Sequence, residues 1–222
     1  MISIRTLING IILLLITTSL WGDAPVRVAP RLQPYAEWSK TPAAKTLMEF
    51  VRHTVSSLIA REKLESRNGD AFPWIQQPVG VFVTAMKGRK VRVCVGAFTP
   101  SEETMGREIV RQCKRLIAED PRHEPLSPYE LDQLQYVVSF VGSPTPIADP
   151  SLLDIWSEGL LMRWGEREAA LLPGEAKTLS WGASALRRQI QVPQHETPSY
   201  ASFPVVVIRE EISPESMNNT NR

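Results

Sequence analysis

Residues 79–98 decide the fold, and they read VGVFVTAMKGRKVRVCVGAF. β-Branched and other apolar residues dominate both ends of this stretch, which is typical of β-strands. Lys87-Gly88-Arg89 separates the two ends and has the glycine and the polar residues of a tight turn. The stretch therefore predicts an antiparallel hairpin with strands over residues 79–86 and 90–98.

The second strand of this hairpin carries chemically distinct side chains. Residues i and i+2 lie about 6.6 Å apart on one face of a strand, so Arg92, Cys94 and Gly96 are expected on one face. The valines at positions 91, 93 and 95 are expected on the other face, toward the core. A guanidinium near a thiol stabilises the thiolate and lowers its pKa, and a glycine leaves room for a ligand. The face with Arg92 therefore predicts an anion-binding site or a cysteine nucleophile.

Helices and further strands surround the hairpin in an irregular order. Apolar residues spaced by three and four predict helices over residues 43–64 and between Ser101 and Asp120-Pro121. Further strands are expected over residues 136–141, 159–164, 168–172 and 203–209, and a partly helical segment over 176–190. Residues 23–42 are rich in proline and predict an extended lead-in, and residues 213–222 predict a frayed tail. The mixture favours one α+β domain over residues 43–212, with an antiparallel or mixed β-sheet.

The composition excludes several classes of function. The 222 residues are 43% hydrophobic and 22% charged, with a net charge of +1. No sustained basic run occurs, so we expect no nucleic-acid partner. The two cysteines form no Cys-x-x-Cys pair and the three histidines (53, 123 and 195) are far apart, so we expect no metal site. No phosphate loop or dinucleotide fingerprint occurs, and we expect no cofactor.

Residues 1–22 have the features of an export signal. Arg5 precedes a mostly apolar run that is shorter than the roughly 20 residues of a membrane-spanning helix. Signal peptides have apolar runs of about 7–15 residues. An uncleaved signal anchor and a buried N-terminal helix are the alternatives. We therefore expect an extracytoplasmic protein, in the periplasm or secreted, that contacts a membrane only if this segment remains uncleaved.

Several short blocks of residues follow one another along the chain. They are residues 78–84 (PVGVFVT) leading into 91–96 (VRVCVG), 120–122 (DPR) followed by 125–131 (PLSPYEL), 137–139 (VVS) with Pro144 and Pro146-Ile147, and then 159–161 (GLL) and 171–173 (LLP). Their succession resembles the AMMECR-type domain family over roughly residues 43–212. The resemblance implies the α+β fold of that family.

The chain departs from the family in its hallmark strand. The family reads Leu-Arg-Gly-Cys-Ile-Gly there, so Arg92, Cys94 and Gly96 match while Val93 replaces a glycine. Residues 120–123 read DPRH where the family has Asp-Pro-Arg-Phe. The family's activity is poorly defined. The resemblance implies that its members are partners of Memo-type proteins and of radical-SAM enzymes, with a role in an intracellular modification pathway. An exported member departs from that setting, so those partners are not carried over.

Three functions remain open at this stage. The first is a binding module that holds a small anionic ligand, a peptide or another protein partner at Arg92, Cys94 and Gly96, with Arg122 as a second cation. The second is an enzyme in which Cys94 is a thiolate nucleophile, activated by Arg92 and by His123 as a general base. The third is a structural envelope protein whose site has decayed, as Val93 would suggest.

Structural interpretations of the same residues also remain open. An arginine on a sheet, such as Arg92, often pairs with a structural carboxylate. Cys113 lies on the apolar stripe of its helix and is expected to pack in the core. A Cys94–Cys113 disulfide would form if that helix packed on the strand with the Cα atoms within about 7 Å. His53 lies off the apolar stripe of its helix and is expected to be solvated.

Overall fold

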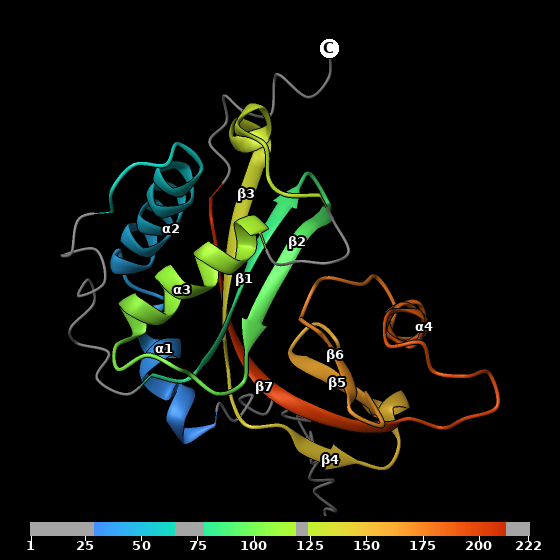
Figure 1. Cartoon of the computed structure of the whole chain (residues 1–222). Coiled ribbons are helices and arrows are strands. Elements are labelled where there is room, and N and C mark those ends of the chain that lie inside the picture. The colour runs from blue at the N-terminus through green and yellow to red at the C-terminus, as the bar shows by residue number, and fades with distance from the viewer. Residues whose placement is uncertain (1–28, 65–77, 119–123, 212–222) are drawn as a thin grey trace, which may run out of the picture.

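The computed structural model describes residues 29–64, 78–118 and 124–211 of an α+β protein (Figure 1). Its strands form one curled antiparallel sheet in the order β2-β1-β3-β7-β5-β6, with β4 paired to β7. The α+β fold expected from the sequence is confirmed. The elements are η1 (Pro30–Leu32), α1 (Gln33–Trp38), α2 (Ala43–Ile59), β1 (Gly80–Lys87), β2 (Lys90–Ala97), α3 (Met105–Ala118), η3 (Pro128–Gln133), β3 (Leu134–Val141), β4 (Thr145–Ile147), η4 (Pro150–Leu152), β5 (Glu158–Trp164), β6 (Arg167–Leu171), α4 (Leu179–Gln189) and β7 (Ser199–Arg209).

The hairpin predicted from residues 79–98 is present as β1 and β2. Gly88 in its turn has a φ of +59°, a backbone conformation that glycine adopts without strain. The register shifts between Ala85 and Met86, so Arg92 has no cross-strand partner and Val91 pairs with Met86. This β-bulge changes which way the side chains point at the start of β2, so the expected alternation of core-facing and outward-facing residues fails at Val91. Val93 and Val95 lie buried in the main core as predicted, whereas Val91 is only half-buried.

The main core lies between the hairpin side of the sheet and the helices α2 and α3. One face of β1, β2 and β3 is apolar because its alternate residues are valine, alanine, tyrosine and phenylalanine. The helices cover this face (Figure 1), and the apolar side chains of α2 pack against it, with Leu47, Val51 and Val55 fully buried. Cys113 of α3 is fully buried among these side chains, so its interpretation as core packing is confirmed. Burial raises the pKa of its thiol to about 12.

The N-terminal part of the described chain differs from the prediction. Residues 23–42 were expected to form an extended lead-in, yet residues 30–38 are helical as η1 and α1. Proline is tolerated at the first positions of a helix, where its missing N–H would have no partner. Leu32, Tyr35 and Trp38 are buried, and Tyr35 lies 4.5 Å from Phe140 between ring centroids. The segment therefore belongs to the folded domain. The helix predicted over residues 43–64 ends earlier, at Ile59.

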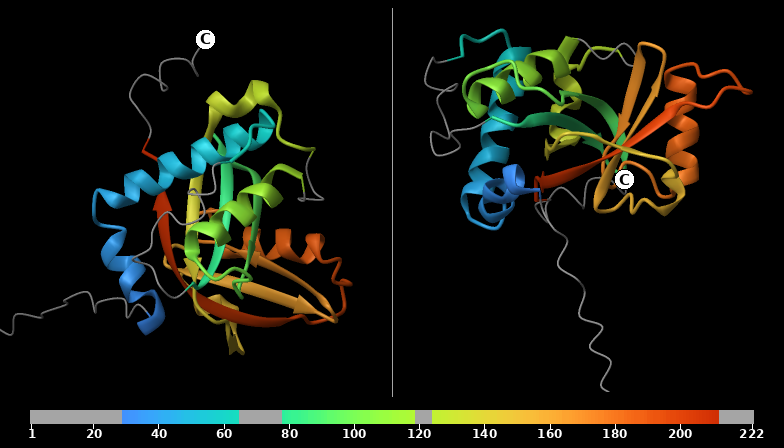
Figure 2. Two further views of the ribbon diagram at one scale, coloured as in Figure 1. Left: turned by 60° about the vertical axis from the view of Figure 1, so that its left-hand side comes forward. Right: turned by 90° about the horizontal axis from the view of Figure 1, so that it is seen from below.

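Strand β7 joins two half-sheets, because it is long enough to serve both. Its residues 205–209 pair with β3, which completes a first half-sheet of β2, β1, β3 and β7. Its residues 199–204 pair with β5 and β4, which completes a second half-sheet with β6. Helix α4 packs on the second half-sheet through Leu186 and Ile190, and it lies at the opposite end of the molecule from α2 and α3 (Figure 2).

The expected export signal over residues 1–22 and the tail over residues 213–222 lie outside the described residues. Within residues 29–64, 78–118 and 124–211, no helix has both the length and the apolar character needed to cross a membrane.

Candidate functional site

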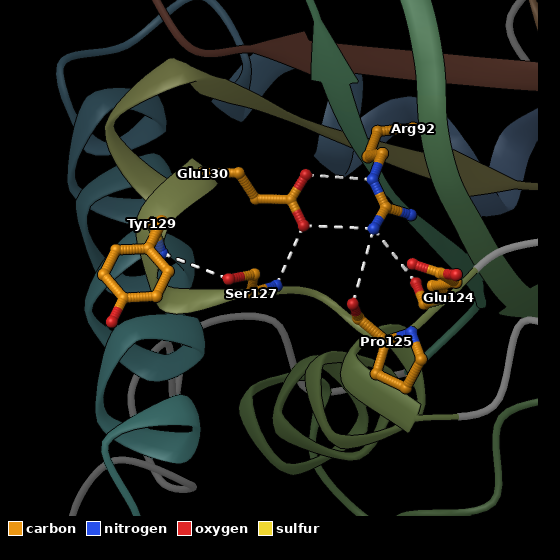
Figure 3. Close-up of polar contacts among 6 residues, drawn as sticks. All are labelled: Arg92, Glu124, Pro125, Ser127, Tyr129 and Glu130. Atoms are coloured by element: carbon orange, nitrogen blue, oxygen red, sulfur yellow. Dashed lines mark hydrogen bonds and ion pairs between the residues drawn. The ribbon is translucent and has the colours of Figure 1, made fainter.

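Arg92 projects from the bulge of β2 toward the turn of helix η3 (Figure 3). Its Nε donates to Oε2 of Glu130 at 2.9 Å, and its Nη2 donates to Oε1 at 3.0 Å. The same Nη2 also donates to the carbonyl oxygens of Glu124, at 3.0 Å, and Pro125, at 3.4 Å. The guanidinium is therefore engaged in a two-point ion pair of the kind that holds arginine in one orientation.

Glu130 is held in place for this ion pair by its own helix. Ser127 caps η3, and the Glu130 carboxylate accepts the backbone N–H of Ser127 at 2.8 Å, which completes a capping box. Burial alone would raise the pKa of Glu130, but the Ser127 N–H and the Arg92 guanidinium outweigh it and hold this pKa below its ordinary value. Arg92 therefore pairs with a structural carboxylate, which was one of the two interpretations of this arginine from the sequence. Tyr129, on the same turn, is 92% exposed.

Gly96 faces the ring of Phe82 rather than an open space. The two residues are cross-strand partners, and a Cβ at Gly96 would overlap the Phe82 side chain. Gly159 and Phe203 repeat this arrangement across β5 and β7. Phe98 lies between the two phenylalanines, 5.4 Å from Phe82 and 4.8 Å from Phe203 between ring centroids. Gly96 is therefore required for the packing that joins the two half-sheets.

Cys94 lies on the face of the first half-sheet that is turned away from α2 and α3. Its cross-strand partner is Thr84, whose hydroxyl donates to the Cys94 sulfur at 3.2 Å. The half-buried thiol packs against the cluster around Phe203, whereas Cys113 belongs to the core on the opposite face. Both cysteines are free, and the alternative of a Cys94–Cys113 disulfide is wrong because the sheet separates them.

A small hollow opens on this same face, next to Thr84. It has room for about one water molecule. It lies between β1, β3, the end of β7 and the loop over residues 172–175 that follows β6. The lining residues are Thr84, Met86, Val137, Ser139, Leu172, Pro173, Gly174, Glu175 and Arg209.

Two polar residues of the hollow carry hydrogen-bond donors. Ser139 is only 1% exposed and lines the hollow. Arg209 is exposed and donates from Nη2 to the Pro173 carbonyl at 3.0 Å. No carboxylate within residues 29–64, 78–118 and 124–211 forms an ion pair with it. Guanidinium has five N–H donors, so most of those on Arg209 remain available.

The loop over residues 172–175 is shaped to lie against Arg209. Gly174 has a φ of +84°, and a Cβ there would come within 2.8 Å of Nη2 of Arg209. Glu175 holds the start of the loop, since its Oε2 accepts the Leu172 N–H at 3.0 Å. One negative and one positive side chain therefore line the same hollow. Such a pair can bind an anionic group that lies beside a hydrogen-bond donor.

The residues predicted from the sequence are only partly brought together. Arg92, Cys94 and Gly96 share one strand, but Arg92 contacts η3 while Gly96 contacts Phe82. Arg122 and His123 lie outside the described residues. His53 is exposed on α2, as expected. In the described part of the chain, no group of three or more histidine, cysteine, aspartate and glutamate residues is placed to hold a metal ion.

The groups around the hollow were not predicted from the sequence. Ser139 is a polar residue inside the otherwise apolar run of β3, and this signal marks it as unusual. Arg209 ends an apolar strand, a common place for a charged residue, so nothing in its local sequence singles it out. Its position becomes informative only because β7 pairs with β3 and places Arg209 beside Val137.

Comparisons with known proteins agree on one family. The sequence model of the AMMECR1 family matches residues 48–195. A protein of Thermotoga maritima is 31% identical over 141 residues, which covers 63% of this chain and 75% of that protein. A protein of Methanothermobacter thermautotrophicus is 29% identical over 145 residues, with the same two coverages. The crystal structure of the uncharacterized protein PH0010 from Pyrococcus horikoshii superposes with a TM-score of 0.62 at 21% identity, over 76% of this chain and 91% of that one.

Proposed function

The chain belongs to the AMMECR1 family, and from that premise we propose that it is a binding module for the carboxylate of a small ligand or peptide. One oxygen of the ligand's carboxylate would enter the hollow at Arg209. The ligand's remaining atoms would lie outside, because the hollow admits about one water-sized group. This differs from the binding face expected from the sequence, since Arg209 takes the place of Arg92.

One observation supports this function above others. An arginine without a carboxylate partner among the described residues and a buried serine line one hollow. The hydroxyl of Ser139 would donate a hydrogen bond to the ligand's carboxylate beside Arg209. Arginine binds planar carboxylates through two N–H donors at once. Glu175 would accept a hydrogen bond from an ammonium or amide group next to the ligand's carboxylate.

The experiment measures the affinity for two small probes by NMR chemical-shift titration. Glycylglycine offers a carboxylate with a neighbouring amide, and its C-terminal amide offers the same atoms without the negative charge. We expect saturable shifts with the free dipeptide and none with the amide. Arg209→Gln should weaken binding by about tenfold or more, because a hydrogen bond to a charged group contributes roughly 1.5–3 kcal/mol.

Two further variants test whether the probe binds at the hollow. Ser139→Ala should weaken binding by roughly threefold to tenfold, since it removes one hydrogen bond of about 1 kcal/mol. Arg188→Gln is the matched control, because Arg188 is an exposed arginine on α4 and lies outside the hollow. Equal binding of the free and amidated probes, or equal weakening by the control, would refute the proposal.

Cysteine chemistry at Cys94 is the second candidate, and the Thr84 hydroxyl 3.2 Å from the sulfur favours it. A hydroxyl donor stabilises a thiolate and so increases its share at neutral pH. The reaction rate of wild-type protein with iodoacetamide, compared with Cys94→Ser, tests this candidate. A rate at pH 7 well above that of free cysteine supports an enzyme, and a rate at or below it would refute a thiolate nucleophile at Cys94.

We also propose that the protein is exported through residues 1–22, on the sequence features alone. The apolar run after Arg5 has the length of a signal peptide. Mass spectrometry of the N-terminus from fractionated cells provides the test. A mature chain that begins after Gly22 in the extracytoplasmic fraction is expected, and an intact Met1 in the cytoplasmic fraction would refute export.

A further inference from the structure

The turn between β1 and β2 lies at one end of the sheet (Figure 1) and is rich in basic residues. Lys87, Arg89 and Lys90 are all exposed there, and we call these three residues the basic turn. Lys87 and Lys90 are direct cross-strand partners in the hairpin register. Like charges directly opposite each other destabilise a sheet. The hairpin therefore carries a pair of like charges whose mutual repulsion an acidic partner would relieve.

The charges of the basic turn are not compensated within the described residues. No carboxylate there forms an ion pair with Lys87, Arg89 or Lys90. Glu130 is the carboxylate whose pKa Lys87 influences, but Arg92 and the Ser127 N–H already occupy its oxygens. The turn is also short and defined, since Gly88 supplies its positive φ. Three cations are thus held in a narrow region with little conformational freedom in the backbone.

We propose that the basic turn is a docking site for an acidic segment of a partner protein. Charge complementarity supports the sign of the partner. Facing side chains of paired strands lie about 5 Å apart, which is close to the spacing of about 6.6 Å between alternate residues of an extended peptide. Carboxylates in such a peptide can therefore meet neighbouring cations. This inference goes beyond the proposed function and does not rest on it.

The same observations favour a peptide over two other anionic partners. Recognition of an anionic lipid surface typically uses about four to eight clustered basic residues, and the basic turn has three. Nucleic-acid binding uses an extended basic surface, whereas this chain has 25 basic and 24 acidic residues and a net charge of +1. A short acidic segment needs only the local charge that the turn supplies.

Fluorescence anisotropy with a rhodamine-labelled hexaglutamate peptide tests the proposal on the full chain. The peptide is acetylated and amidated, so all of its carboxylates are side-chain groups, and Arg209→Gln is expected to leave its affinity unchanged. We expect binding that weakens as ionic strength rises toward about 0.15 M, because salt screens exposed charges. The triple variant Lys87→Gln, Arg89→Gln and Lys90→Gln should weaken binding by about tenfold, since each exposed ion pair contributes roughly 0.2–1 kcal/mol.

A matched triple variant separates the site from the total charge. Lys114→Gln, Lys177→Gln and Arg188→Gln remove the same charge from exposed positions elsewhere on the described chain, and we expect them to leave the affinity within about twofold. Equal weakening by both triple variants would overturn the proposal, as would no detectable binding of the peptide. Tighter binding of phosphatidylserine vesicles or of an oligothymidine, lost in the same variant, would assign the turn to a lipid or a nucleic acid instead.

Discussion

Gly96 and Phe82 face each other across β2 and β1, and this contact assigns a structural reason to one residue of the hallmark strand. The ring of Phe82 lies where a Cβ on residue 96 would project. A glycine in a strand weakens it locally, because glycine has no side chain to pack and loses more backbone entropy. Packing of an aromatic ring over the glycine offsets this cost. The residue is therefore explained without a ligand.

Gly96→Ala is expected to destabilise the protein by about 2 kcal/mol, because an added methyl group in a packed region forces its neighbours to move. Urea unfolding followed by circular dichroism measures the change. In a Phe82→Ala background the same substitution should cost at least about 1 kcal/mol less, since the two residues are in contact. An equal cost in both backgrounds would show that the ring is not the obstacle.

At the scale of elements, η3 is joined to the hairpin by Arg92 and Glu130. Ser127 caps the helix, and Glu130 serves both the cap and the ion pair. The two family blocks around residues 91–96 and 125–131 therefore meet in one cluster. Because Glu130 is largely excluded from solvent, its loss leaves both a guanidinium and a backbone N–H without their partner.

Glu130→Gln is expected to destabilise the protein at pH 7 by about 1.5–3 kcal/mol, the contribution of a hydrogen bond to a charged group. The folded-state pKa of Glu130 is below the ordinary value of 4.5, so its carboxylate contributes stability above pH 4.5 and loses it as the pH falls through the folded-state pKa. The difference between wild type and variant in urea unfolding should therefore shrink under acid conditions. A difference independent of pH would contradict this account, and Glu103→Gln, on the exposed loop before α3, is the control.

The whole molecule is held together by β7 and by the contacts at its end. Glu210 accepts from Nη2 of Arg52 on α2 at 2.7 Å and from the Tyr136 N–H at 3.1 Å. The hydrogen bond from Arg52 to Glu210 raises the pKa of the guanidinium. Arg52 also donates to the carbonyl oxygens of Leu131 and Leu134. These contacts fix the end of β7. Strand β7 pairs with strands of both half-sheets, so its position affects both.

Glu210→Ala is expected to lower the free energy of unfolding by about 2–4 kcal/mol, because it leaves a partly buried guanidinium without its carboxylate. Since β7 belongs to both half-sheets, the loss should appear in both at once. Hydrogen exchange of β1–β3 and of β5–β6 should accelerate together, and unfolding should remain one transition. Faster exchange in only one half-sheet would show that the halves unfold separately. Glu211→Ala, at an exposed neighbouring position, is the control.

The sequence by itself determined most of the elements and the α+β class, because apolar periodicity and turn residues are local properties. It also placed Cys94 and Thr84 on strands and Cys113 on a buried helical face. The prediction from the sequence was wrong for residues 30–38. The prolines there predicted an extended chain, but burial of Leu32, Tyr35 and Trp38 stabilises a helix. Tertiary packing outweighs local preference there.

Only the tertiary structure decided what the residues of the hallmark strand contact. Arg92 was expected beside Cys94, but a bulge in the register and a carboxylate 38 residues away direct it to η3. Ser139 and Arg209 share a hollow because β3 and β7 pair and the loop after β6 folds over them. Register, strand order and the curl of the sheet depend on contacts between distant residues, and local sequence patterns do not encode those contacts.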